Sequence, residues 1–305
     1  MVYVLLIVGL ACLIYGGNWL VDGSVKLAKR LGISPLLIGL TLVGFGTSTP
    51  ELVTSLLAAF NKSEGIAVGN VVGSNIANIF LVLGVAAFLS PVQVDLKSFR
   101  RDGTFLALST IMLIIAVLLG RIGGIMGMIL VGTLIVYVVY SYFSDKKQQQ
   151  QEKASLETGR PLLAFAQTII GIGLTLLGAK LLVDNASLLA EKWHISKRVI
   201  GLTIVAVGTS LPELITSIMS AIHKHNDVAF GNVVGSNIYN ALFILGITAV
   251  FMPIEIRESM GLDLWVLTGA TAALIGIALW RRRFSRGIGA LFLLIYAVYV
   301  WRLFA

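Results

Sequence analysis

Charged residues are scarce in this chain of 305 residues. Asp, Glu, Lys and Arg together make up 12% of it, whereas 57% is hydrophobic and the mean hydropathy is +0.92. A soluble domain of this size carries about twice that share of charge, because its surface must face water. The composition therefore excludes an ordinary soluble fold and predicts an all-α protein that spans a membrane.

Cysteine is nearly absent as well. Cys12 is the single cysteine, so a disulfide framework is excluded. The net charge of +8 does not indicate a nucleic-acid partner, because the basic residues stand in short gaps between apolar runs and not in one patch. Residues 1–17 carry no charge, unlike a signal peptide, and are predicted to form a retained transmembrane helix.

Apolar stretches long enough to cross about 30 Å of hydrocarbon recur along the chain. Their ranges are 2–22, 34–60, 66–90, 103–120, 122–143, 162–190, 197–222, 228–252, 260–280 and 287–304. Residues 144–160 are polar and are interpreted as a cytoplasmic linker. The chain is thus predicted to have ten transmembrane helices, five in residues 1–143 and five in residues 161–305.

The basic residues of the loops predict an orientation. Loops after the odd-numbered helices hold 15 of the 23 Lys and Arg residues, and the opposite side holds seven. Positive loops remain in the cytoplasm. The protein is therefore predicted to be a multi-pass protein of the cell membrane with both termini extracellular.

The sequence contains a duplication. A shift of 162 residues lays Ser34–Pro91 over Ser196–Pro253 without a gap, and 30 of the 58 positions are identical. Each copy belongs to a unit of five spans, so the second copy enters the membrane from the opposite side. Inverted repeats of this kind are typical of secondary transporters, whose binding sites lie between the repeats near the membrane midplane.

Two motifs recur in both copies. GFGTSTPEL at 44–52 matches AVGTSLPEL at 206–214, and GNVVGSNIAN at 69–78 matches GNVVGSNIYN at 231–240. Pro50 and Pro212 lack a backbone N–H, so each is expected to interrupt its helix and to loosen nearby carbonyls, including those of Gly44 and Ala206. Irregular backbone at membrane depth is tolerated where it is buried or lines a cavity.

Glu51 and Glu213 follow these prolines inside apolar spans. An ionised carboxylate there costs at least about 3 kcal/mol, and no basic residue stands in the same helices to offset it. A bound cation is the simplest partner. Thr47 and Ser48 precede Glu51 by four and three residues, so helical spacing places their hydroxyls near its carboxylate.

The surrounding polar residues are all oxygen donors. Asn70, Ser74 and Asn78 form a stripe at spacing four, repeated by Asn232, Ser236 and Asn240, beside small residues that permit close helix packing (Gly69, Gly73 and Ala77). Histidine and cysteine do not occur in the motifs, so zinc and copper are disfavoured. Oxygen donors suit sodium and calcium, and two carboxylates neutralise one calcium ion.

The paired motifs resemble the alpha-repeats of the calcium/cation antiporter superfamily, and most of all those of prokaryotic sodium/calcium exchangers. The resemblance covers the ten-helix layout and implies exchange of sodium for calcium by alternating access, with three sodium sites, one of which overlaps the calcium site. It implies that long helices 1 and 6 slide. The site residues it implies are Glu51, Glu213, Thr47, Ser48, Thr209, Ser210, Ser74, Ser236 and the carbonyls of Gly44 and Ala206.

Two departures from the family pattern stand out. Thr49 stands where the second copy has Leu211, which is interpreted as a packing change. Asn240 stands where potassium-dependent members carry Asp, so Asn78 and Asn240 are the neutral residues that complete the candidate ion site. Their neutrality predicts exchange without potassium.

Other functions remain open at this point. A proton/calcium exchanger would use the same two glutamates, and a cation channel would use them as a selectivity element. A membrane hydrolase is disfavoured because no nucleophile has a His or Lys partner at membrane depth. The prediction is a transporter and not an enzyme, a monomer in the bilayer, with calcium and sodium as cargo and no cofactor.

Overall fold

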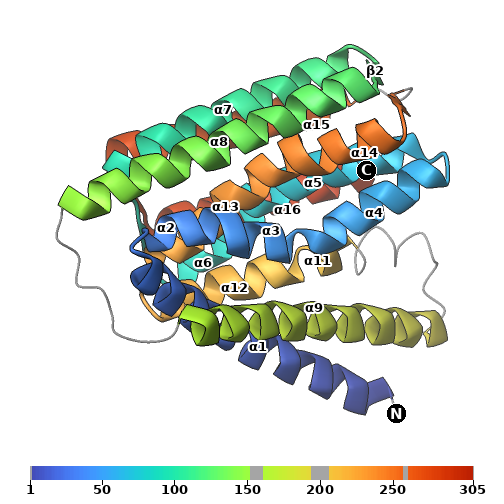
Figure 1. Cartoon of the computed structure of the whole chain (residues 1–305). Helices are drawn as coiled ribbons and strands as arrows, with labels where there is room; N and C mark the ends of the chain where they lie inside the picture. Colours follow the sequence, from blue (N-terminus) through green and yellow to red (C-terminus); the bar gives the residue numbers. More distant parts are fainter. Residues whose placement is uncertain (1, 152–160, 194–205, 257–259, 305) are drawn as a thin grey trace.

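The fold was analysed in a computed structural model that describes residues 2–151, 161–193, 206–256 and 260–304. It is a bundle of helices whose long axes follow one common direction (Figure 1). The helices are α1 (Val2–Leu31), α2 (Pro35–Ile38), η1 (Gly39–Val43), α3 (Gly44–Thr47), α4 (Thr49–Phe60), α5 (Glu64–Ala77), η2 (Asn78–Val82), α6 (Leu83–Leu89), α7 (Leu96–Leu118), α8 (Gly124–Gln151), α9 (Pro161–Lys192), α11 (Ala206–Thr209), α12 (Leu211–Ile222), α13 (Asn226–Tyr239), η4 (Asn240–Ile244), α14 (Leu245–Phe251), α15 (Gly261–Arg281) and α16 (Arg286–Phe304). The three η segments are single π-helical turns.

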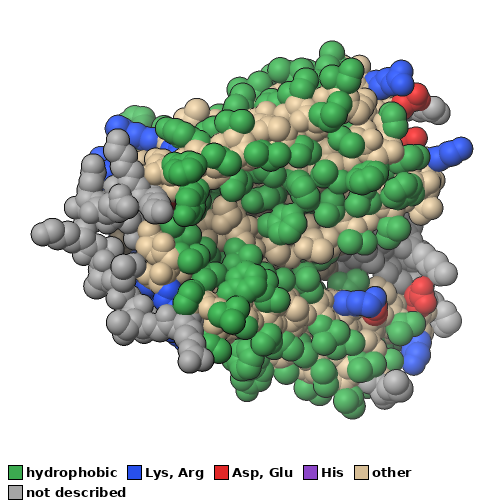
Figure 2. Space-filling view, viewed as in Figure 1, with side chains coloured by type: hydrophobic (Ala, Val, Ile, Leu, Met, Phe, Trp, Pro, Cys, Tyr) green, Lys and Arg blue, Asp and Glu red, His purple; other side chains and the backbone are tan. Residues whose placement is uncertain are grey.

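Eight helices in the described ranges are long and apolar enough to cross a membrane, and the bent pair Pro35–Thr47 and Thr49–Phe60 makes a ninth. They lie at the ranges expected from the sequence. The remaining expected span, 197–222, is described only from Ala206 onward, and its first part lies outside the described residues. Hydrophobic side chains cover the middle of the molecule, and charged side chains gather toward its two ends (Figure 2). The protein is an all-helical membrane protein.

Three predicted helix ends were wrong. Helix α1 continues to Leu31 and not to residue 22, with an exposed ion pair of 3.2 Å between Lys26 and Asp22 on its polar end, and α7 begins at Leu96 and not at residue 103. Helix α8 continues past residue 143 to Gln151. A helix that leaves the hydrocarbon keeps its own hydrogen bonds, so the hydropathy of a segment marks where the membrane ends and not where the helix ends.

The duplication extends to the local structure. Helices α4, α5, α6 and the turn η2 have bounds that become those of α12, α13, α14 and η4 when 162 is added to each residue number. Lys62 and Lys224, at the same place in the two copies, both have positive φ, at 57° and 62°. The two copies, which are similar in sequence, therefore have the same local structure as well.

Two short antiparallel ribbons join the halves. β1 (Val92–Gln93) pairs with β4 (Arg283–Phe284), and β2 (Arg121–Ile122) pairs with β3 (Ile254–Glu255). Helix α15 runs from β3 to β4, so the ribbons lie at opposite ends of that helix. The largest apolar core lies between them and draws on both halves, with Ile76, Leu83, Val234 and Leu245 among its fully buried members.

Helices α1 and α9 lie side by side along one side of this core (Figure 1). Small residues line their contact: a Cβ at Gly16 would stand 2.7 Å from the Thr175 amide, and one at Gly9 would stand 3.0 Å from the Gly178 carbonyl. The two long helices therefore meet along a smooth, closely packed seam.

Candidate cation-binding site

The two motif helices are interrupted at equivalent serines. Ser48 (φ −81°, ψ 10°) separates α3 from α4, and Ser210 (φ −88°, ψ 5°) separates α11 from α12. In the first copy the axis bends by 44° at this break. A proline follows each serine by two residues. Because proline has no N–H, the carbonyl four residues before the proline has no helical donor. The sequence correctly predicted an interruption at both places.

The predicted loosening of the Gly44 carbonyl was wrong. The Ser48 amide donates to it at 3.1 Å and the Thr47 hydroxyl at 3.4 Å, so the Gly44 carbonyl keeps its helical partner. The reason is that proline removes the donor at position 50 and leaves the amide of position 48 in place. In the second copy, α11 begins at Ala206, and no further contact of its carbonyl is described.

The two glutamates lie at the centre of the molecule. Glu51 and Glu213 are each 1% exposed, although they come from helices 162 residues apart. The Ser48 hydroxyl donates to Glu213 Oε1 at 2.9 Å, and the Ser210 hydroxyl lies beside the Glu51 carboxylate. Each break therefore places a hydroxyl beside the glutamate of the other copy.

This crossing corrects a sequence prediction. The spacing of three residues placed Ser48 beside Glu51, but that spacing holds only within one continuous helix. Because the helix ends at Ser48, its hydroxyl points across to Glu213. Thr47 behaves in the same way and lies 3.2 Å from Asn232 Oδ1 of the second copy. Thr209 is half-buried at the second break.

Two asparagines fix the backbone at the glutamates. Asn70 Nδ2 donates to the Glu51 carbonyl at 3.0 Å and to Ser55 Oγ at 2.9 Å. Asn232 Nδ2 donates to the Glu213 carbonyl at 3.2 Å and to the Ser217 hydroxyl at 3.0 Å. The sequence analysis missed Ser55 and Ser217, although the pattern Glu-Leu-X-Thr-Ser occurs in both copies.

The second motif crosses the core at Asn75 and Asn237. Asn75 Nδ2 donates to the Asn237 carbonyl at 3.2 Å, so the two copies meet at equivalent residues. Asn78 and Asn240, each 1% exposed, begin the π-helical turns η2 and η4. Single π-turns occur frequently at functional sites because they re-aim side chains. The spacing of four residues singled out Asn78 and Asn240, whereas the sequence analysis missed Asn75 and Asn237.

Several buried oxygens at this centre have no hydrogen-bond partner in the described part of the chain. They are Glu51 Oε2, Glu213 Oε2, Ser236 Oγ, Asn75 Oδ1, Asn237 Oδ1, Asn78 Oδ1 and Asn240 Oδ1. Each such group costs about 1–3 kcal/mol unless something pairs with it. Ser74, 7% exposed, belongs to the same stripe. A set of unpaired oxygens around two carboxylates suits a hard cation.

The predicted packing of the small residues occurs in the second copy. A Cβ at Gly231 would stand 2.7 Å from the Leu36 carbonyl, and Gly235 packs against the Leu40 carbonyl. Nothing described lies within 4 Å of a Cβ at Gly69 or Gly73. Helix α13 thus touches the backbone of the first motif helix, and the prediction for Gly69, Gly73 and Ala77 of α5 stays a prediction, because the residues equivalent to Leu36 and Leu40 lie outside the described ranges.

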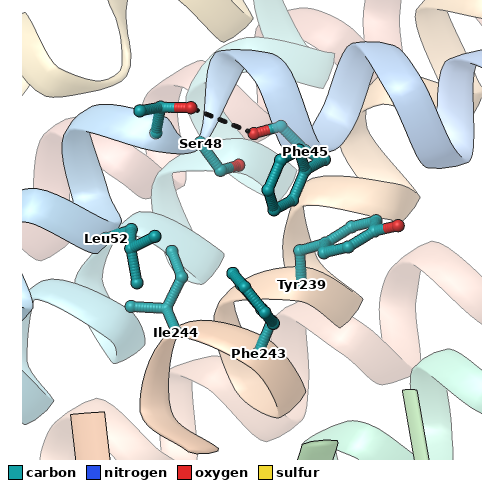
Figure 3. A pocket seen from close by; sticks show the side chains of 7 residues that line it. Phe45, Ser48, Leu52, Tyr239, Phe243 and Ile244 are labelled. Atoms are coloured by element: carbon teal, nitrogen blue, oxygen red, sulfur yellow. Dashed lines mark hydrogen bonds between the residues drawn. The ribbon is translucent and has the colours of Figure 1, made fainter. Parts of the chain in front are cut away.

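A small pocket leads toward Ser48. Figure 3 shows Phe45, Leu52, Tyr239, Phe243 and Ile244 around it, with Ser48 on its wall. Phe45 contacts both Tyr239 and Phe243, at ring-centroid distances of 5.6 and 5.3 Å. Thr49 also lines the pocket, and its hydroxyl donates to the Phe45 carbonyl, so the walls are mostly apolar and the Ser48 hydroxyl connects them to the Glu213 carboxylate.

No group of three or more His, Cys, Asp or Glu side chains gathers anywhere in the ranges described. Neither central glutamate has an ion-pair partner there. A cation held here would therefore take two carboxylates and complete its shell with hydroxyl, amide and backbone oxygens.

The profile of the sodium/calcium exchanger protein family matches residues 1–143 and 163–305, nearly the whole sequence. The chain belongs to this family. It is 34% identical to the putative antiporter CaxA of Alkalimonas amylolytica, over 99% of this chain and 98% of the relative. It is 33% identical to the sodium/calcium exchanger MaX1 of Methanosarcina acetivorans, over 84% and 85% of the two chains.

Solved structures agree with the sequence comparison. The sodium-calcium exchanger NCX_Mj, soaked with 2.5 mM Na⁺ and 1 mM Sr²⁺, superposes with a TM-score of 0.87 at 32% identity and covers 98% of this chain and 97% of that one. The chain is thus a membrane antiporter of the cation/calcium class and not an enzyme.

Proposed function

We propose that this protein exchanges sodium for calcium across the membrane by alternating access. The observation that carries the proposal is the pair of buried glutamates, Glu51 and Glu213, with Glu213 hydrogen-bonded by Ser48 of the opposite copy. A site built from both repeats is taken apart when the repeats move relative to one another. That is what an antiporter needs in order to release an ion on either side.

The ligands proposed for the transported ions are those predicted from the sequence. The side chains are Glu51, Glu213, Thr47, Ser48, Thr209, Ser210, Ser74, Ser236, Asn78 and Asn240, with the carbonyls of Gly44 and Ala206. One calcium ion neutralises the two carboxylates, whereas the family's three sodium ions leave one positive charge over. The exchange is therefore electrogenic, and the neutral Asn78 and Asn240 leave potassium without a carboxylate ligand.

Several observations support ten spans in two inverted repeats, with 1–143 and 161–305 on either side of the linker 144–160. In Figure 1 the chain runs in opposite directions through α2 to α4 and through α11 to α12. The ribbons β1–β4 and β2–β3 map onto each other under the shift of 162 and lie at opposite ends of α15. The excess of Lys and Arg in the odd-numbered loops favours extracellular termini.

The contacts of α1 and α9 support sliding of these two helices. The Ile172 side chain of α9 packs on Gly46 at the first break, and Val183 of the same helix packs on Gly208 at the second. Gly17 of α1 faces Ile215 of α12. Helix α9 thus touches both breaks. A shift of α9 along its smooth seam with α1 would change the surroundings of both glutamates together.

Calcium uptake into proteoliposomes tests the proposal. Purified protein is reconstituted with sodium inside, and uptake of ⁴⁵Ca²⁺ is measured after dilution into sodium-free buffer or into buffer with equal sodium. Uptake is expected only with the outward sodium gradient. Uptake driven by an outward proton gradient without sodium would overturn the proposal in favour of proton exchange.

A further inference from the structure

An open groove lies between α15 and α16, next to the turn that joins them. Its lining residues are Ile277, Arg281, Ser285, Gly287, Ile288 and Leu291. The two helices pack on different partners, α15 on α7 and α5, and α16 on α6 and η2. The outer space between them is therefore left uncovered, with apolar walls along the helices and a basic end at the turn.

The basic end holds four arginines: Arg281, Arg282, Arg283 and Arg286. All four are exposed, and none of their guanidinium groups has a carboxylate partner in the described residues. Even with the Asp95 carboxylate near the adjoining ribbon, the turn keeps a net positive charge. Such a turn attracts an anion.

The duplication provides an internal reference for this turn. The equivalent turn between α7 and α8 has Leu119, Gly120, Gly123 and Gly124 where the second copy has Arg281, Arg282, Ser285 and Arg286. Gly120 and Arg282 both adopt the left-handed conformation, with φ of 72° and 54°. This conformation suits glycine and disfavours arginine. The fold therefore needs no arginine here, and the charge has another use.

The turn is held in a fixed position. The β4 strand pairs with β1, and the Val94 amide donates to the Arg282 carbonyl at 2.9 Å. Trp280, beside the first arginine, is 91% exposed. Tryptophan concentrates where spans leave the hydrocarbon and meet the lipid headgroups. The arginines thus stand at headgroup depth while the groove descends along the acyl chains.

We propose that this groove binds an anionic phospholipid. The phosphate of the headgroup lies against Arg281 and Arg286, and one acyl chain follows Ile277, Ile288 and Leu291. Charge complementarity selects an anionic lipid such as phosphatidylglycerol over phosphatidylcholine. The orientation proposed above puts the turn at the cytoplasmic leaflet, whose surface is negative because of such lipids.

Native mass spectrometry of the purified full-length protein tests this site. The protein is mixed with equal amounts of phosphatidylglycerol and phosphatidylcholine, and the lipid retained is identified. Phosphatidylglycerol is expected to be retained preferentially, and Arg281→Gln or Arg286→Gln to weaken its binding about fivefold each. The matched control is Arg121→Gln, at the position equivalent to Arg283 in the first copy, which is expected to change nothing.

A second variant separates a seated lipid from general attraction to charge. Ile288→Trp fills the groove without altering the charge, and it is expected to weaken retention of phosphatidylglycerol as the arginine variants do. Equal losses for Arg121→Gln and Arg281→Gln, or full retention by Ile288→Trp, would overturn the proposal. Binding of soluble glycerol phosphate as tight as that of the lipid would also overturn it, because the groove would then play no part.

Discussion

At the scale of single residues, the centre of the protein depends on pairs that no local pattern contains. Ser48 serves the glutamate of the other copy, and Asn232 joins the Glu213 backbone to Thr47 of the first copy. A substitution at one of these positions therefore disturbs both repeats. The glutamates themselves supply the negative charge of the site.

Replacement of Glu213 by Gln keeps the side-chain volume and removes one of the two charges that neutralise calcium. Calcium uptake driven by sodium is expected to fall to background, while the protein still inserts and folds, since a neutral amide is cheaper to bury than a carboxylate. Uptake in proteoliposomes and the melting temperature in detergent check both parts. Glu191→Gln, on the exposed end of α9, is the control and should transport normally.

Replacement of Asn240 by Asp adds a titratable group at the start of η4, where the amide it replaces has no described partner for either of its polar atoms. Calcium uptake by this variant is expected to decline between pH 8 and pH 6 more than uptake by the wild type, because a buried carboxyl takes up protons more readily than an exposed one. Uptake is measured at both pH values under the same sodium gradient. An unchanged ratio would show that position 240 lies away from the ion path.

At the scale of elements, the surroundings of the site depend on how closely the helices of the second motif pack against the interrupted helices of the first. Helix α13 packs through glycine onto the carbonyls of α2 and η1, so the first break is held against the second motif. This packing brings the backbones of the two motifs into direct contact.

The close packing at Gly235 can be tested with a pair of glycine variants. Gly235→Ala places a methyl group onto the Leu40 carbonyl and is expected to destabilise the protein by about 1–3 kcal/mol. Gly269→Ala, on the exposed face of α15, meets no described atom within 4 Å and is expected to be neutral or to stabilise that helix by up to about 1 kcal/mol. Melting temperatures in the same detergent check the comparison. Equal losses would mean that the contact with the Leu40 carbonyl is not what makes Gly235 sensitive to substitution.

At the scale of the whole molecule, the proposed stoichiometry moves one net positive charge in each cycle, in the direction of sodium. That charge is worth about 2.3 kcal/mol per 100 mV. In sodium-loaded vesicles, an interior made positive with potassium and valinomycin is expected to speed calcium uptake, because net positive charge then leaves. If neither the rate nor the final calcium level responds to the clamped potential, the exchange is electroneutral and the ratio of three to one is wrong for this chain.

The sequence by itself determined the class of protein and the centre of its chemistry. Scarce charge required a membrane, and the shift of 162 residues exposed the duplication. Glu51 and Glu213 could be found without coordinates, because a carboxylate in an apolar span is costly wherever it points. The interruptions at Ser48 and Ser210 followed from proline chemistry, which is equally local.

Only the tertiary structure decided which groups meet. Helical spacing is a property of one continuous helix, so it assigned Ser48 to Glu51, whereas the break turns its hydroxyl to Glu213. The contact of Asn75 with Asn237 and the crowding at Gly235 likewise depend on how the two copies pack. These contacts join residues far apart in the chain, so no local pattern in either copy contains them.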